Sequence, residues 1–543
     1  MRTLTELLHD CREYRQLMEM VTSRGKCVAA EGASGAGKAL LVAAAFLRTG
    51  RTCLVVTYNH EQASRLVTDL QAFASRGPDE PGDVRLLPAT ESVIYDGAAP
   101  EPHLRAERLD AVDRLLSGSP TLVVTTINAA LQLMAPADAV RQHQFMIEVG
   151  DEVDRQDLLE HLIAAGYRRE NLVDDMGQFS ARGGVIDVFP PTRQHPVRME
   201  FFGDQVESIR QFDLETQRSA MHLNSLTIGP AGEVPLTRSV AARAAPIIRN
   251  ALQRETARLR RAEHIAEAER WVARVEGDLE RIETLQPVHA IEHYLPYLYE
   301  RLDCVLDYLP EDALLVIDEP VRLKSHADQY EAEVKQAYQT RVRRGEVLKL
   351  PYVACLSLDQ LTQRFGNRAQ ICLTMLARDV PWAPGAPSLR FATPPVDSFG
   401  GQLDLLVEGI REWQKTRHRV VVSTPQVRRI TQMLGHRGLK CTPLNDAEGL
   451  APNRVHLARL PLSSGFKLPA ANLVVLTDSE IFGWQKLRRP KRRRFQSGIT
   501  VTSLSELAPG DYVVHINHGV GIYEGLVKQT VQGVERDYLL IKY

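Results

Sequence analysis

The sequence predicts a multidomain α/β protein, and three observations carry that prediction. The chain has 543 residues, which is too long for a single hydrophobic core. Residues 26–50 read as a strand, a glycine-rich turn and a helix, and further strand–helix pairs follow at 51–74 and 121–134. This alternation favours a parallel, doubly wound sheet with the turn at the carboxyl edge of its strands. Later in the chain, a β-rich pattern and a second α/β pattern indicate further domains.

Changes in these patterns divide the chain into six expected segments. They are a P-loop α/β domain at 1–145, a small inserted β-rich domain at 146–235, a helical and α/β completion of the first module at 236–345, a second α/β domain at 346–484, a basic linker at 485–505, and the start of a C-terminal β-barrel at 506–543.

Composition excludes several classes of protein. The 66 basic residues face 68 acidic ones, so overall charge says nothing about nucleic acid. The seven cysteines are scattered without a C-x-x-C spacing, which indicates neither a metal site nor a dithiol pair and suits a reducing cytoplasm. No targeting peptide and no apolar run of membrane-spanning length is present. We therefore expect a cytoplasmic protein with no membrane partner.

The glycine-rich turn "EGASGAGKAL" fits the phosphate-binding loop G-x-x-x-x-G-K-[ST] through Gly32, Gly37 and Lys38. Ala39 stands where a Ser or Thr should hold magnesium, so the loop is degenerate. Backbone N–H groups and the helix dipole can still bind a phosphate there. We expect no turnover and assign no catalytic residue.

A second nucleotide-site pattern occurs at "DALLVIDEP", where Asp318 and Glu319 follow an apolar strand. In a Walker B strand the carboxylate would orient magnesium, and its neighbour would orient the attacking water. Asp-Glu pairs are also frequent at strand ends in other α/β proteins. Together, the two motifs favour descent from a P-loop nucleoside triphosphatase.

The β-rich stretch at 166–219 carries candidate interface residues. Arg168, Arg182 and Phe189 belong to an arginine-and-aromatic set of the kind enriched at protein interfaces. Arginines are seldom buried, which favours an exposed role for Arg168 and Arg182. For Phe189 the alternative, a place in the core of the small sheet, is the favoured explanation, because aromatic residues are so often in the core.

The C-terminal stretch "DYVVHINHGVGIYEGL", followed by "DYLLIKY", alternates as strands do. A small twisted barrel can offer an exposed edge to a strand of a partner. Tyr523, Leu526 and Val527 are the candidates for such a contact face, with the barrel's own core as the alternative. The basic run at 486–495 is typical of a flexible linker, although it could also bind phosphates.

Three stretches of the chain resemble known families. Residues 177–191 and 196–219 are similar to a domain shared by the repair protein UvrB and the transcription-repair coupling factor family. Residues 90–116 resemble the coupling factors and lack the tyrosine-rich hairpin with which UvrB clamps DNA. Residues 507–543 resemble the RNA-polymerase-interacting domain of coupling factors and CarD-type regulators. The chain thus resembles the N-terminal half of the coupling factor family.

The resemblance implies a degenerate RecA/UvrB-like sheet (UvrB-like domains 1A, 2 and 1B) and a Tudor/SH3-like barrel start. It also implies a role in transcription-coupled nucleotide excision repair, with UvrA and the RNA polymerase β subunit as partners. It assigns Arg168, Arg182 and Phe189 to the UvrA surface, and Tyr523, Leu526 and Val527 to polymerase.

The family's translocase motor, which uses ATP and magnesium and makes the main DNA contacts, would follow Tyr543. We therefore expect a fragment or a truncated product, monomeric and without a cofactor of its own. We also expect Arg182→Glu to abolish UvrA binding with thermal stability nearly unchanged. Two alternatives stay open: an active ATPase or helicase subunit using Lys38 and Asp318, and a CarD-like transcription regulator.

Overall fold

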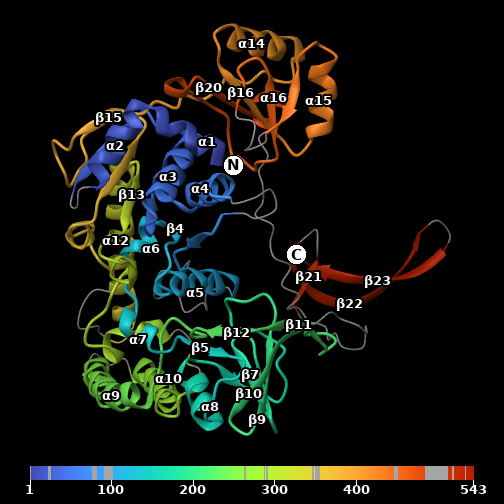
Figure 1. Ribbon diagram of the computed structural model, residues 1–543. Helices are drawn as coiled ribbons and strands as arrows, with labels where there is room; N and C mark the ends of the chain where they lie inside the picture. Colours follow the sequence, from blue (N-terminus) through green and yellow to red (C-terminus); the bar gives the residue numbers. More distant parts are fainter. Residues whose placement is uncertain are drawn as a thin grey trace. The chain divides into compact units, whose positions relative to one another are not determined.

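A computed structural model of the chain (Figure 1) forms two compact units, Met1–Trp484 and Gln485–Tyr543, which are described separately. The structure describes residues 2–22, 26–75, 82–90, 102–261, 265–286, 288, 291–344, 348, 355–444, 450–483, 512–515, 519–531 and 534–542. The predicted basic linker at 485–505 lies outside these residues.

A seven-stranded sheet in which all pairs are parallel forms the centre of the first domain, in the order β15-β1-β14-β13-β2-β4-β3. Its strands are β1 (Cys27–Glu31), β2 (Cys53–Thr57), β3 (Val84–Leu87), β4 (Leu122–Thr126), β13 (Leu314–Asp318), β14 (Gln370–Thr374) and β15 (Ser388–Arg390). Strands such as CLVVT are buried along their whole length, because helices cover both faces of the sheet.

The two faces of this sheet have different covers. One face packs against the N-terminal helices α1 (Arg2–Glu6), α2 (Arg12–Thr22), α3 (Gly35–Thr49) and α4 (His60–Phe73), together with the turn η1 (Leu7–Asp10). The other face packs against α5 (Pro102–Leu116), α6 (Ile127–Leu131), α7 (Ala137–Arg141), α12 (Pro320–Arg344) and α13 (Leu358–Gln363). The predicted doubly wound α/β domain is thus confirmed (Figure 1).

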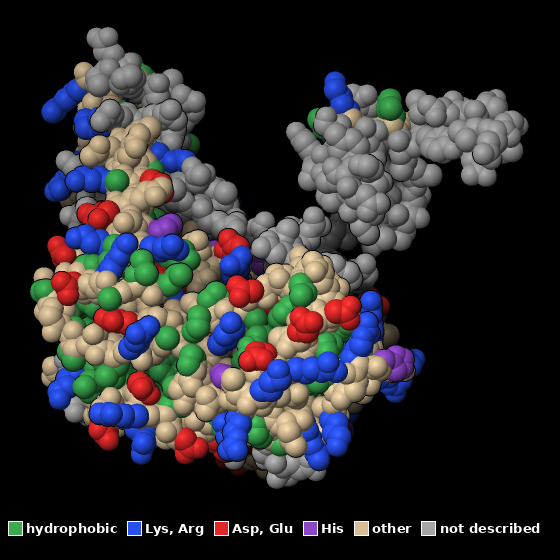
Figure 2. Space-filling model, turned by 90° about the horizontal axis from the view of Figure 1, so that it is seen from above, with side chains coloured by type: hydrophobic (Ala, Val, Ile, Leu, Met, Phe, Trp, Pro, Cys, Tyr) green, Lys and Arg blue, Asp and Glu red, His purple; other side chains and the backbone are tan. Residues whose placement is uncertain are grey.

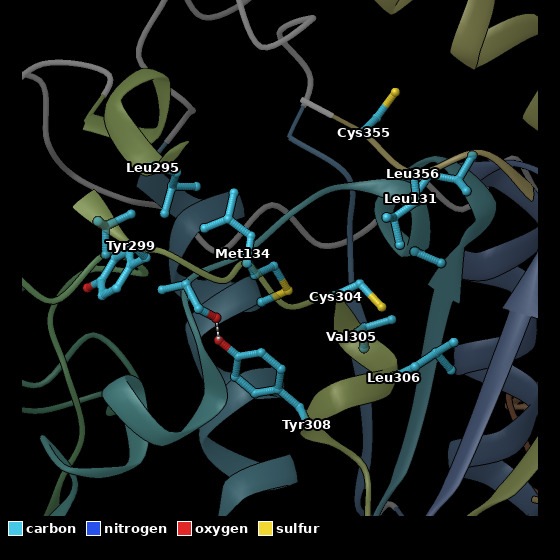
Figure 3. Close-up of a cluster of buried hydrophobic side chains, with 14 of the residues drawn as sticks. Leu131, Met134, Leu295, Tyr299, Cys304, Val305, Leu306, Tyr308, Cys355 and Leu356 are labelled. Carbon is cyan, nitrogen blue, oxygen red and sulfur yellow. Dashed lines mark hydrogen bonds between the residues drawn. The ribbon is translucent and has the colours of Figure 1, made fainter. Parts of the chain in front are cut away.

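A helical segment extends the second of these cores. It comprises α9 (Arg238–Arg261), α10 (Ile265–Glu283), η2 (Ile291–Tyr294), α11 (Leu295–Leu298) and η3 (Val305–Tyr308). Figure 3 shows the junction: Met134, Leu295, Val305 and Leu306 lie in one apolar cluster. The Tyr308 hydroxyl donates a 2.8 Å hydrogen bond to the Ala135 carbonyl, so the polar tip of this buried ring is satisfied.

The β-rich domain contains a six-stranded sheet in the order β11-β10-β9-β8-β7-β6. Its strands are β6 (Arg168–Arg169), β7 (Gln178–Arg182), β8 (Val185–Val188), β9 (Val197–Phe202), β10 (Gln205–Phe212) and β11 (Ser219–Leu223). Helix α8 (Arg155–Ala164) and the pair β5 (Phe145–Glu148) and β12 (Ser225–Ile228) enclose its apolar core, which is separate from the cores of the other domains.

The second α/β domain has a five-stranded sheet in the order β17-β18-β16-β20-β19. It contains α14 (Leu403–Lys415), β16 (Arg419–Ser423), α15 (Val427–Gly435), β17 (Cys441–Pro443), β18 (Val455–Ala458), β19 (Phe466–Leu468), η4 (Pro469–Ala471), β20 (Leu473–Thr477) and α16 (Asp478–Phe482). One face has its own core, whereas Val421, Phe466 and Val475 join the core beneath α1–α4.

The predicted boundary at residue 346 differs from the structure. Strands β14 and β15, which the sequence pattern places in the second α/β domain, belong to the seven-stranded sheet of the first. The physical reason is that a buried parallel strand looks alike in either sheet, so its sequence does not say which neighbour it pairs with.

The C-terminal unit is a three-stranded antiparallel sheet of β21 (Tyr512–His515), β22 (Gly519–Val531) and β23 (Val534–Lys542), as the alternation predicts. In the described part of the chain, no helix is long and apolar enough to cross a membrane. The same residues hold no group of three His, Cys, Asp or Glu side chains placed to bind a metal. Basic and acidic side chains are interspersed on the face seen in Figure 2, as the balanced composition suggests.

Candidate functional site

The predicted phosphate loop lies where the sequence places it, between β1 and α3. Asp318 is the last residue of β13, which is separated from β1 by a single strand of the same sheet. Lys38 Nζ lies 2.6 Å from Asp318 Oδ1 and 2.7 Å from Glu319 Oε1. Lys38 is 5% exposed and Asp318 is fully buried. The fold therefore brings the Walker-type lysine and both predicted carboxylates together.

The carboxylates have further partners. Asp318 Oδ2 accepts hydrogen bonds from Thr57 and Gln62, and Glu319 Oε1 accepts one from the Met375 backbone N–H at 3.0 Å. Burial alone would lower the pKa of the Lys38 ammonium, but the fields of Asp318 and Glu319 together raise it. In an active site, the lysine would contact phosphate and the aspartate would hold magnesium. Here the lysine instead pairs with both carboxylates.

Two amides of the loop are also occupied. The Ser34 N–H donates to Thr393 Oγ1 at 2.7 Å, and the Ala36 N–H donates to Ser464 Oγ at 3.3 Å. The Ser34 hydroxyl, which could cap α3, instead donates to the Thr393 carbonyl. Donors of this kind bind phosphate in nucleotide-binding loops. Side chains of the same polypeptide therefore occupy part of the cradle.

Ala39 and the two motif glycines are also consistent with a loop that is occupied by the protein's own side chains. Ala39 is fully buried, and its methyl group packs in the core beneath α1–α4, where a hydroxyl would need a partner. Gly32 has a φ of +85°, a left-handed conformation that glycine adopts without strain. Both predicted glycines, Gly32 and Gly37, lie close to the 392–393 segment.

A buried carboxylate lies next to this loop. Asp69 of α4 is 1% exposed and accepts hydrogen bonds from the Ser463 backbone N–H and hydroxyl, both at 2.6 Å. Burial raises the pKa of Asp69 to about 7, although the Ser463 hydrogen bonds and the charge of Arg65 oppose that shift. Asp69 thus joins the first α/β domain to the second through a titratable contact.

This contact predicts a pH dependence of stability. Because the folded state holds the Asp69 proton up to about pH 7, while the unfolded chain loses it near its ordinary pKa of 3.8, Asp69 should lower stability as pH rises through that window. Asp69→Asn should flatten this part of the profile. Denaturant unfolding at pH 5 and 8 measures it, with Asp138→Asn, in an exposed surface pair, as the control. Equal slopes for wild type and Asp69→Asn would contradict the assignment.

The β-rich domain presents the second candidate site, on the outer face of its six-stranded sheet. Strand register pairs Arg168 with Gln178, Ser180 with Asp187, and Asp187 with Arg198. Directly paired residues point to the same side of a sheet, and alternate residues along a strand share a face. Arg168, Arg182, Asp187 and Arg198 therefore lie on one face, opposite the apolar core.

Asp187 organises this arginine face. It is 1% exposed and accepts two hydrogen bonds from Arg198, at 2.7 and 2.9 Å, and one from Arg182 at 3.1 Å. The Arg198 guanidinium also lies 4.7 Å from the centre of the Phe212 ring. The Arg182 side chain remains 53% exposed, so one arginine is fixed and the other is available to a partner.

The predicted surface residues behave differently from one another. The Arg168 side chain is exposed and has no hydrogen-bond or ion-pair partner among the residues described. Phe189 is only 3% exposed, because its ring packs with Val173 and Phe212 in a small cluster. Its predicted place on the contact surface is corrected: the ring is enclosed in this cluster and is not exposed to a partner. The expectation that Arg182→Glu is neutral for stability is also revised, because Arg182 contacts a buried carboxylate.

Tyr523, Leu526 and Val527 lie on β22, where they pair with Ile541, Leu539 and Tyr538 of β23. Their side chains lie outside what the structure describes, so their role as a contact face stays a prediction.

Sequence reasoning missed several residues of these sites, among them Asp69 and Ser463. Asp187 carries a detectable signal, since it is a lone carboxylate inside an apolar strand, and Arg198 stands at the matching position of the next strand. Thr393 and Ser464 carry no such signal, because hydroxyl residues are common in connections and only the tertiary fold brings them to the loop.

Two known protein families match parts of this chain. The family described as the UvrB interaction domain matches residues 145–233, which include the whole arginine face. The CarD-like/TRCF RID domain matches residues 507–543. A transcription-repair-coupling factor of Bacillus subtilis (strain 168) is 30% identical over 515 residues, which cover 94% of this chain and 43% of that protein.

Nearly the whole chain is similar to the N-terminal half of the transcription-repair-coupling factors. The coupling factor of Myxococcus xanthus is 32% identical over 98% of this chain and 45% of that protein. That of Staphylococcus aureus (strain MRSA252) is 25% identical over the full chain and 46% of its own length. The chain therefore spans less than half the length of these curated coupling factors.

Proposed function

We propose that this chain acts in transcription-coupled nucleotide excision repair as the recruitment half of a coupling factor. It binds UvrA through the arginine face of the β-rich domain and the RNA polymerase β subunit through residues 507–543. The match of residues 145–233 to the UvrB interaction domain, on which Arg168 and Arg182 are exposed, carries the proposal. It works in the cytoplasm as a monomer, and DNA contact belongs mainly to a motor outside this chain.

We further propose that the phosphate loop has no catalytic role and that the chain needs no cofactor of its own. Support comes from Lys38, whose charge is neutralised by Asp318 and Glu319, and from the loop amides already bonded to Thr393 and Ser464. Ala39 supplies no magnesium ligand.

Capture of purified UvrA and purified polymerase β subunit, each in a separate assay, tests the proposed function. Binding to both supports it, whereas binding to polymerase alone would favour a CarD-like regulator. Phosphate release from ATP by the wild-type chain, with and without DNA, tests the ATPase alternative. Steady release would favour that alternative.

Arg168→Glu should weaken UvrA binding by tenfold or more, because it reverses a charge on the proposed contact face. The melting temperature should stay within about 1 °C, since the exposed Arg168 side chain has no hydrogen-bond or ion-pair partner in the described structure to lose. Isothermal titration and a thermal melt measure the two effects. Arg428→Glu on α15, an exposed arginine of the other α/β domain, is the matched control. Equal affinities for both variants would remove Arg168 from the interface.

A further inference from the structure

We propose that the former phosphate loop now serves as an intramolecular docking site for the hydroxyl groups of Thr393 and Ser464. These contacts set the position of the second α/β domain on the first. The inference concerns the chain's own domains and does not depend on UvrA or polymerase binding.

Thr393 is the first group in this site. It lies in the connection between β15 and α14 and is fully buried. Its hydroxyl accepts from the Ser34 N–H at 2.7 Å and lies 3.1 Å from the Ser34 carbonyl, to which it can donate. A Cβ atom at Gly37 would lie only 2.4 Å from Thr393 Oγ1, so the missing side chain of Gly37 makes room for this hydroxyl. The glycine that the phosphate-loop motif requires at position 37 therefore leaves space for the Thr393 side chain.

Ser464 is the second group, and it comes from the segment between β18 and β19 of the second α/β domain. Its hydroxyl accepts from the Ala36 N–H at 3.3 Å, and a Cβ at Gly35 would lie 2.6 Å from it. The preceding Ser463 is bonded to the buried Asp69 through both its backbone and its hydroxyl. Adjacent serines therefore contact both α3 and α4 of the first domain.

Apolar packing alone would not specify this position. Phe466 and Phe73 pack edge to face with ring centres 6.4 Å apart, and residues of both domains share one core. Such burial supplies attraction but is not directional. Hydrogen bonds from the loop amides are directional, and leaving a buried amide unpaired costs free energy. The loop amides therefore select one register of the second domain among those that the apolar surfaces allow.

Hydrogen–deuterium exchange of the full chain tests the inference. In the double variant Thr393→Val/Ser464→Ala, peptides covering 31–38 and 460–466 should exchange about tenfold faster, as the loss of one or two hydrogen bonds predicts. Peptides covering β16 and β20 should not change. The control Thr431→Val/Ser325→Ala removes two exposed hydroxyls that bond only within their own helices, and it should change none of these peptides. Equal acceleration of β16 and β20 would indicate general destabilisation and overturn the inference.

A substitution in the loop and the addition of a phosphate ligand give two further tests. Gly37→Ala should displace Thr393 and accelerate the same peptides, although both hydroxyls are present. The single Thr393→Val variant, which keeps the shape of the side chain, replaces the double variant if the latter does not fold. Inorganic pyrophosphate should leave exchange in peptides covering 31–38 of the wild type unchanged. Slower exchange on addition of pyrophosphate would show that the loop amides are free for phosphate and would overturn the inference.

Discussion

Replacing Lys38 with methionine is expected to lower the free energy of unfolding by about 3–5 kcal/mol, the usual cost of removing one partner from a buried ion pair. Lys38 is the cation that pairs with both Glu319 and the fully buried Asp318. Methionine has a similar length and no charge, so the buried Asp318 carboxylate and the mostly buried Glu319 carboxylate would lose their cation. Denaturant unfolding of the wild type and the variant measures the loss.

The control is Lys415→Met, which breaks a pair with Glu412 whose side chains are 76% and 66% exposed. Such a pair should contribute less than about 1 kcal/mol. Adding Asp318→Asn and Glu319→Gln to Lys38→Met should restore part of the lost stability, because the uncompensated charges disappear. A loss below 1 kcal/mol for Lys38→Met alone would show that the lysine does not hold the carboxylates in place.

This result changes how the ATPase alternative has to be tested. Replacing the loop lysine is the usual way to abolish hydrolysis, but here the replacement is expected to destabilise the first domain. Loss of activity in a Lys38 variant would therefore not distinguish catalysis from stability. Turnover by the wild-type chain, measured before any substitution, is the informative experiment.

Arg182→Glu is expected to abolish capture of UvrA, if the proposed function holds, and to lower the melting temperature of the β-rich domain by about 4–8 °C, which corresponds to roughly 1 kcal/mol in a domain of this size. Binding is lost because the arginine face gains a negative charge. Stability falls because the new carboxylate lies beside Asp187, which is buried and already bonded to Arg198. A pull-down and a thermal melt measure the two effects.

Arg437→Glu is the matched control for this variant, since Arg437 also forms an exposed ion pair, with Asp404 at 3.3 Å, but lies in the second α/β domain. It should retain UvrA binding. Retained binding by Arg182→Glu would exclude Arg182 from the interface. If Arg182→Glu loses binding and its melting temperature falls much further than that of the control, lost binding could come from a lost contact or from a lost fold. Arg182→Gln separates these two causes. Retained fold with lost binding in Arg182→Gln would assign Arg182 to the interface.

The sequence was a good guide to the elements and a partial guide to the sites. The phosphate loop, the strand ending at Asp318 and the alternating strands of the β-rich domain follow from local spacing, and the structure confirms them. The assignment of β14 and β15 to the second α/β domain was wrong, because strand periodicity does not name a neighbour. The surface role of Phe189 was wrong, because aromatic composition does not distinguish an exposed ring from one that is buried in a small apolar cluster.

By itself, the sequence determined where a phosphate loop could form and that Ala39 deprives it of a magnesium ligand, since both depend on residues next to one another in the chain. Only the tertiary structure decided what fills that loop. Lys38 meets Asp318 across 280 residues, and Ser34 meets Thr393 across 359. Contacts over such separations depend on how sheets and domains pack, and no local pattern encodes them.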